Sequence, residues 1–224
     1  MVQVSTRLSN GEDESGFGFV VGERDNLLYV ITANHMVRAG RPDIDTLAVR
    51  LRFSHDPWSR PVEAELLQAR HRRLDLALLR VPIPDGLSLS WRVLHFCTRM
   101  ERGEKAWFIG REQEWFVPTD AEAGAIHEPE PDLDGYIEFG ISSVKPGSSG
   151  APVMTRRGLI GMITDDDVTD ARAVAVQFIR RFAREHRVPW ALSDCRGAPA
   201  PSPTDYGELK PDTDLRNTLK DASQ

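Results

Sequence analysis

Short apolar runs recur along the chain, and residues that favour turns separate them. Gly, Pro, Asn and Asp fill the intervals, while β-branched side chains are frequent inside the runs. Many short runs of this kind indicate an all-β sandwich or barrel. The runs that predict strands are residues 17–21, 27–32, 47–53, 62–67, 76–81, 106–109, 136–139, 152–154 and 159–163.

One segment late in the chain has the period of a helix instead. Between residues 175 and 186, apolar side chains recur at the spacing of one helix face, and mostly charged side chains lie opposite. The residues of the predicted apolar face are Val176, Ile179, Phe182 and Ala183. Pro189 is expected to end this amphipathic helix.

Two breaks in composition divide the chain into three predicted parts. A Pro- and Gly-containing segment at 82–86 follows one strand closely and suggests a boundary between a first β-lobe, 1–88, and a second lobe, 89–190. A Pro-rich stretch after Trp190 leads into polar sequence, which predicts a flexible tail or linker over 191–224.

Composition narrows the classes of protein that need to be considered. The chain has 224 residues, 40% of them hydrophobic, which suffices for a packed core. A net charge of -6 gives no reason to expect nucleic-acid binding. No apolar run approaches the roughly 20 residues that span a membrane, and the N-terminal residues lack the apolar segment of a signal peptide.

The cysteine content bears on the compartment. Cys97 and Cys195 are the two cysteines of the sequence, too few for the disulfide framework of a small secreted protein. We therefore expect a soluble protein of a reducing, cytoplasmic compartment. The basic residues are nearly all arginine, a bias that hints at a bacterial source with a GC-rich genome.

Three polar residues stand in apolar, strand-like contexts in the order His, Asp, Ser. His35 follows one predicted strand, Asp75 directly precedes another, and Ser149 lies in a turn flanked by glycines. A serine hydroxyl is a weak nucleophile that needs a base within hydrogen-bond reach, and the base needs a third group to orient it. Together the three residues could supply those roles.

Each residue taken alone also has a structural explanation. A histidine after a strand can be a packing residue, and a Gly-Xaa-Ser-Gly string can be an ordinary turn. Asp75 could lie exposed at a strand edge and pair with Arg72 or Arg73. A carboxylate buried at that position would need a partner, because an unpaired buried charge is costly.

Taken jointly, the motifs resemble those of the chymotrypsin-like serine proteases, closest in style to the bacterial Deg-type domains. Thr-Ala-Asn-His at 32–35 is similar to the family's Thr-Ala-Ala-His, with Asn34 as a departure. Gly-Ala-Pro at 150–152 is similar to the family's Gly-Gly-Pro. The resemblance extends from Gly16 to about Glu185 and includes the segment 159–164, which resembles the strand that follows the nucleophile.

This resemblance implies a fold and a set of roles. The expected fold is all-β, a double six-stranded β-barrel with one C-terminal amphipathic helix and a flexible tail. The triad mechanism needs no cofactor and no metal, so neither is expected. The implied roles are His35 as general base, Asp75 as the orienting carboxylate, Ser149 as nucleophile, the backbone N–H groups of Gly147 and Ser149 as oxyanion hole, and Ser143, Thr164 and Asp165 as substrate pocket.

Two departures from the family bear on control and specificity. Ser148 stands where digestive trypsin-like enzymes carry the aspartate that pairs with a newly cleaved N-terminus, so zymogen cleavage is not expected. Ordering of a loop, or a regulatory partner recruited through residues 198–224, would control activity instead. The acidic run at 165–167 could attract a basic substrate side chain or be a charged turn.

The sequence thus predicts an intracellular serine endopeptidase that cleaves protein or peptide substrates. The alternative is a catalytically silent, protease-like binding module, or an effector subunit of a larger bacterial stress or defence assembly. Neither hypothesis includes a nucleic-acid or membrane partner.

Overall fold

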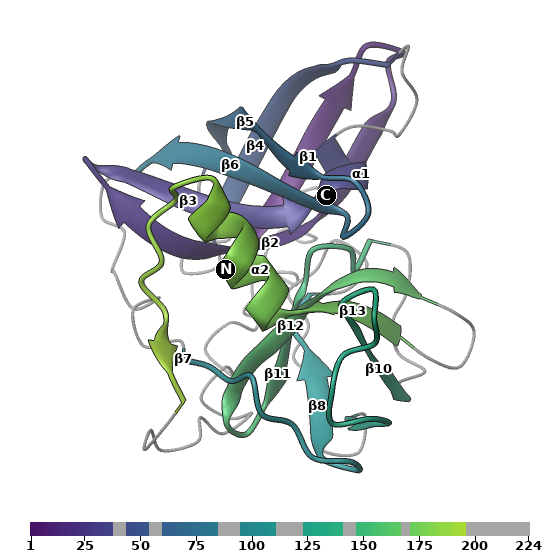
Figure 1. The fold of residues 1–224 in the computed structure, drawn as a ribbon. Helices are drawn as coiled ribbons and strands as arrows, with labels where there is room; N and C mark the ends of the chain where they lie inside the picture. Colours follow the sequence, from purple (N-terminus) through teal and green to yellow (C-terminus); the bar gives the residue numbers. More distant parts are fainter. Residues whose placement is uncertain are drawn as a thin grey trace, which may run out of the picture.

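A computed structural model describes residues 1–37, 44–53, 60–84, 95–110, 123–140, 147–166 and 171–195, with the side chains of 68–70 and 165–166 left out. The described chain forms two β-barrels, one above the other in Figure 1, with a helix beside their junction. The predicted fold class is confirmed. Ser143 and residues 198–224, which the sequence analysis singled out, lie outside the described residues.

The first barrel is closed by six antiparallel strands in the order β1-β2-β3-β6-β5-β4. Along β1, alternate residues from Val2 to Leu8 are buried and the residues between them are more exposed, as a strand with one face on a core requires. The strands are β1 (Val2–Leu8), β2 (Asp13–Arg24), β3 (Leu27–Ala33), β4 (Thr46–Phe53), β5 (Val62–His71) and β6 (Leu76–Pro82).

The second barrel closes because β11 pairs with both β8 and β12. Its antiparallel ring runs β8-β9-β10-β13-β12-β11. The strands are β8 (Lys105–Phe108), β9 (Gly124–Ile126), β10 (Tyr136–Gly140), β11 (Pro152–Thr155), β12 (Gly158–Asp166) and β13 (Ala171–Ala175). Two short strands, β7 (His95–Phe96) and β14 (Ser193–Asp194), extend the sheet from β12 in parallel pairings.

Two helices occur within the described residues: α1 (Asn34–Val37) and α2 (Val176–Glu185). The four residues predicted for the apolar face of α2 are all buried, so that prediction is confirmed. The helix ends at Glu185, before Pro189, and Arg187, with a φ of 57°, turns the chain off the helical path. There the N–H of Val188 donates to Ala183 O (2.9 Å) and the N–H of Arg187 to Arg184 O (3.0 Å), the Schellman pattern of helix termini.

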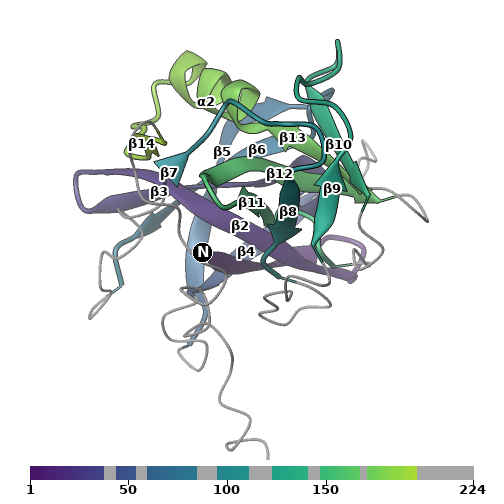
Figure 2. The same cartoon turned by 90° about the horizontal axis from the view of Figure 1, so that it is seen from below.

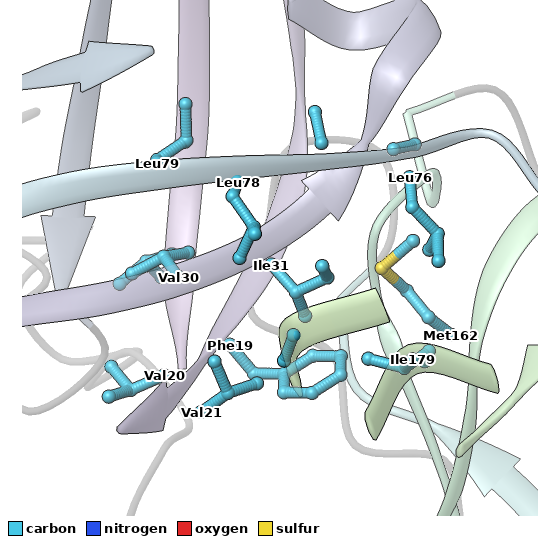
Figure 3. Packing of buried hydrophobic residues seen from close by; sticks show 14 of the residues in the cluster. Phe19, Val20, Val21, Val30, Ile31, Leu76, Leu78, Leu79, Met162 and Ile179 are labelled. Carbon is cyan, nitrogen blue, oxygen red and sulfur yellow. The ribbon is translucent and has the colours of Figure 1, made fainter. Parts of the chain in front are cut away.

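An apolar core joins the two barrels and α2. Figure 3 shows Met162 of β12 beside Leu76 of β6 and close to Ile179 of α2. All three are fully buried and belong to one hydrophobic cluster with the interior of the first barrel. Burial of this kind is the dominant favourable contribution to folding, so the barrels are packed against each other as one unit.

Residues 191–195, here called the C-terminal arm, are the described part of the predicted tail. The sequence predicts a flexible tail from residue 191, but β14 pairs with β7, as Figure 2 shows, and Cys195 forms a disulfide with Cys97. Residues 193–195 are therefore attached to the rest of the described chain. The prediction of a reducing compartment rested on the low number of cysteines, and the structure joins those two cysteines in a disulfide. No helix within the described residues is long and apolar enough to cross a membrane.

Candidate active site

α1 places His35 directly after the buried strand β3. The first N–H groups of a helix have no intrahelical partner and need acceptors from elsewhere. Here the N–H of Asn34 donates to the backbone oxygen of Asp75 (2.9 Å), and the N–H of His35 donates to Asp75 Oδ1 (2.9 Å). Ala33 pairs with Leu76 across β3 and β6, which sets α1 and Asp75 at the same end of the barrel. Asp75 thus caps the helix that carries His35.

The second carboxylate oxygen of Asp75 binds the imidazole itself. Asp75 Oδ2 lies 2.5 Å from His35 Nδ1. For this bond Nδ1 carries the proton, which leaves Nε2 as the basic nitrogen. The Asp75 side chain is 20% exposed and that of His35 is 42% exposed, so the ring is partly accessible while its partner is largely covered. Arg73 pairs with Asp134 instead, which decides against the alternative of an Asp75–Arg73 pair.

The candidate nucleophile lies in a tight turn of the second barrel. Gly147 and Gly150 have φ values of 88° and 82°, in the left-handed region that favours glycine. Ala151 N–H donates to the backbone oxygen of Ser148 (3.0 Å), and Gly150 N–H donates to Ile163 O on β12 (2.8 Å). Ser149 is half-buried at the apex, whereas Ser148 is buried.

Strand β2 of the first barrel holds this turn. Phe17 N–H donates to the backbone oxygen of Ser149 (2.8 Å). A Cβ added to Gly16 would lie 2.6 Å from that same oxygen and 2.9 Å from Met36 Cε, so only glycine fits between the turn and α1. A Cβ on Gly150 would meet Phe17 O at 1.9 Å. The structure therefore brings Ser149 to the end of the first barrel that carries His35 and Asp75.

The predicted pocket residues are placed only in part. Thr164 lies on β12, is 7% exposed, and its Oγ1 has no hydrogen-bond partner among the described residues. Asp165 faces Arg172 in the backbone register of β12 and β13. The pocket therefore stays a prediction. Within the described residues, no group of three or more His, Cys, Asp or Glu side chains could hold a metal ion.

Tyr136 lies near the candidate site but gave no functional signal in the sequence. The Tyr136 hydroxyl donates to the backbone oxygen of Arg73 (2.7 Å), two residues before Asp75. Burial, and secondarily the negative charge of Asp75, raises the pKa of Tyr136 above its ordinary value. Tyr136 belongs to the second barrel and Arg73 to the first, so this contact depends on the tertiary fold and not on spacing along the chain.

Comparison with known proteins relates this architecture to a protein family. The family model of the trypsin-like peptidase domain matches residues 16–162. The chain belongs to that family. The match begins at the glycine that separates Ser149 from α1, and it includes His35, Asp75 and Ser149. No curated protein matches this trypsin-like peptidase domain.

Three solved structures resemble the domain in fold. Deg5 is 18% identical, with 80% of this chain and 85% of that chain covered and a TM-score of 0.56. The MamO protease domain of Magnetospirillum magneticum is 18% identical, with coverage of 80% and 94% and a TM-score of 0.53. A human pathogenic astrovirus serine protease is 16% identical, with coverage of 78% and 88% and a TM-score of 0.51.

Proposed function

We propose that this trypsin-like peptidase domain is an active serine endopeptidase that cleaves protein or peptide substrates. In the proposed reaction, His35 Nε2 takes the proton of Ser149 Oγ as the oxygen attacks the scissile carbonyl. The imidazolium then gives that proton to the leaving amine. Water hydrolyses the resulting acyl-enzyme with His35 again as base. Asp75 holds the imidazole tautomer and stabilises the imidazolium.

Backbone groups of the Ser149 turn complete the proposed machinery. The N–H groups of Gly147 and Ser149 would donate to the oxyanion that forms on the carbonyl oxygen. Such donors act best when they are fixed before the reaction. The bonds from Gly150 to Ile163 and from Phe17 to Ser149 hold the turn from both barrels, which supports this role.

The observation that carries the proposal is the double engagement of Asp75 with His35. Capping α1 requires only an acceptor for the backbone N–H, which Asp75 Oδ1 supplies. The bond from Oδ2 to Nδ1 adds nothing to the cap, but it fixes the ring and leaves Nε2 as a base. A purely structural aspartate would need no such second bond.

Further parts of the proposal concern specificity, control and location. Ser143, Thr164 and Asp165 would line the substrate pocket, and a partner bound through residues 198–224 would order the Ser149 turn. Ser148 supports control without zymogen cleavage, because a hydroxyl cannot form an ion pair with a new N-terminus.

A cytoplasmic location and a bacterial source stay predictions. The Cys97–Cys195 bridge does not support the cytoplasmic prediction, because disulfides persist mainly in oxidising compartments.

A cleavage-site profile of a complex peptide mixture tests the function. Wild type is expected to produce new N-termini with a consistent residue preference, and Ser149→Ala is expected to produce none above background while keeping its fold. Loss of a triad serine lowers turnover by about a million-fold. An identical profile from both proteins would contradict the proposal. A folded wild type that cleaves nothing, even with its physiological partner, would favour the silent binding module.

A further inference from the structure

The backbone at Asp75 adopts a conformation that needs support from its surroundings. Its φ is 51°, in the left-handed region that few residues other than glycine occupy. Such a conformation persists only where neighbouring contacts fix it. Both carboxylate bonds to His35 depend on it, because the direction of the side chain follows from the backbone.

Residues 72–75 form the turn between β5 and β6, here called the Asp75 turn. Contacts within the first barrel hold this turn only in part. Asp75 N–H donates to the backbone oxygen of Arg72 at 3.3 Å, long for a hydrogen bond. Leu74 N–H donates to His71 Nδ1 at 3.1 Å. Neither bond holds the peptide carbonyl of Arg73, which lies between them in the chain. In Figure 1 the turn between β5 and β6 extends from the first barrel toward the second.

The second barrel contacts that carbonyl through Tyr136. The Tyr136 hydroxyl donates to Arg73 O at 2.7 Å. Tyr136 is itself fixed, because its N–H donates to Asp132 Oδ1 (2.8 Å) and its backbone oxygen accepts from Asp132 N–H (2.8 Å). The Arg172 guanidinium lies over the ring, 4.4 Å from its centre. These contacts hold Tyr136 in place, with its hydroxyl directed toward the Asp75 turn.

A second contact between the same segments is weaker. Arg73 pairs with Asp134, but their side chains are 70% and 53% exposed, and ion pairs this accessible are largely screened by solvent. The charge of Asp75 is the second cause, after burial, of the raised pKa of Tyr136. The phenol therefore lies within electrostatic range of the carboxylate and stays a hydrogen-bond donor at neutral pH.

We infer that Tyr136 is a positioning residue for the proposed reaction: through its bond to Arg73 O, it holds Asp75 in the conformation that orients His35. This inference rests on the proposed function. It means that the second barrel contributes to the His35–Asp75 pair as well as to the nucleophile. Alignment of His35 with Ser149 then depends on the contact between the barrels.

The test is Tyr136→Phe, which removes one hydroxyl and keeps the ring under Arg172. The expected result is a fall in kcat of about tenfold with KM unchanged. The free energy of one hydrogen bond corresponds to about this factor in rate. Tyr29→Phe is the matched control. Tyr29 faces Arg80 across β3 and β6 and lies under Arg24, four residues along β3 from Ala33, which pairs with Leu76 beside Asp75. It is expected to leave kcat unchanged.

Two further readouts separate positioning from stability and from the proposed function. The Nδ1 proton of His35, hydrogen-bonded to Asp75, is expected to give a low-field NMR resonance that shifts in Tyr136→Phe and stays in place in Tyr29→Phe. In an Asp75→Asn background, Tyr136→Phe is expected to have no further effect on kcat, because the residue acts through Asp75.

An unchanged His35 resonance in folded Tyr136→Phe would overturn the inference, whatever the effect on stability. A full tenfold loss that persists in the Asp75→Asn background would overturn it as well. If folded wild type proves inactive, the proposed function fails, and the resonance alone decides whether Tyr136 positions the pair.

Discussion

Asp75 combines three tasks in one side chain and one peptide. Its backbone oxygen and Oδ1 cap α1, Oδ2 binds His35 Nδ1, and its φ of 51° allows all three bonds at once. Aspartate and asparagine tolerate this conformation better than most residues because their short polar side chains bond locally. The backbone conformation therefore favours aspartate or asparagine at this position. Of these two, only aspartate has a carboxylate that can orient the imidazole.

Asp75→Asn separates these tasks. The asparagine side-chain oxygen can still accept the N–H of His35, so the free energy of unfolding should change by less than about 1 kcal/mol. Its NH2 group would face Nδ1 and impose the wrong imidazole tautomer, so kcat should fall about 10⁴-fold. Steady-state kinetics and urea unfolding measure the two effects. Asp75→Ala, which also removes the cap, should cost about 1 kcal/mol more.

Gly16 separates the Ser149 turn from α1, and Gly16→Ala should disturb both. The new methyl would lie 2.6 Å from Ser149 O and 2.9 Å from Met36 Cε, so we expect a loss of about 1–3 kcal/mol in stability together with loss of turnover. Gly18→Ala is the matched control, because its methyl would also meet a backbone oxygen at 2.6 Å, that of Ile31 inside the first barrel.

For this comparison, kcat is measured per folded molecule at a temperature where both variants remain native. Gly18→Ala should lose stability but keep its turnover. Equal turnover of the two folded variants would contradict the role given to Gly16 at the site.

At the scale of elements, the sequence predicted best where a strand is buried on both faces. The first four residues of β6 are all buried, and their uninterrupted apolar run was readily identified. β1 lacked such a run because exposed Ser5 and Arg7 alternate with its core residues. α1, β7 and β14 are too short for any periodic signal, and each is fixed by contacts with distant segments.

The C-terminal arm offers a prediction at this scale. The disulfide joins residues 98 positions apart and fastens β14 beside β7, outside the two closed barrel rings. Cys97→Ser combined with Cys195→Ser should therefore lower the free energy of unfolding by about 2–4 kcal/mol, while peptidase activity at 25 °C stays close to wild type. Thermal unfolding with and without a thiol reductant measures the stability. Inactivation of still-folded enzyme by mild reductant would show that the arm supports the site.

At the scale of the whole molecule, both barrels contribute to the candidate active site. The first supplies His35 and Asp75, the second supplies the Ser149 turn, and Phe17 and Tyr136 each donate a hydrogen bond across the boundary. The order of the three candidates and the β-rich pattern were visible in the sequence. The cross-barrel bonds were not, because they join residues 63 or more positions apart whose proximity exists only in the folded chain.

The account depends most on Ser149 being a nucleophile activated by His35. Labelling of the folded protein with a fluorophosphonate, followed by mass spectrometry of its peptides, tests this directly. The predicted result is one phosphonate adduct, on Ser149, that forms at least about 10³-fold more slowly in His35→Ala, because the hydroxyl is unreactive without its base. Absence of an adduct in folded wild type, or labelling that proceeds equally fast in His35→Ala, would contradict the account.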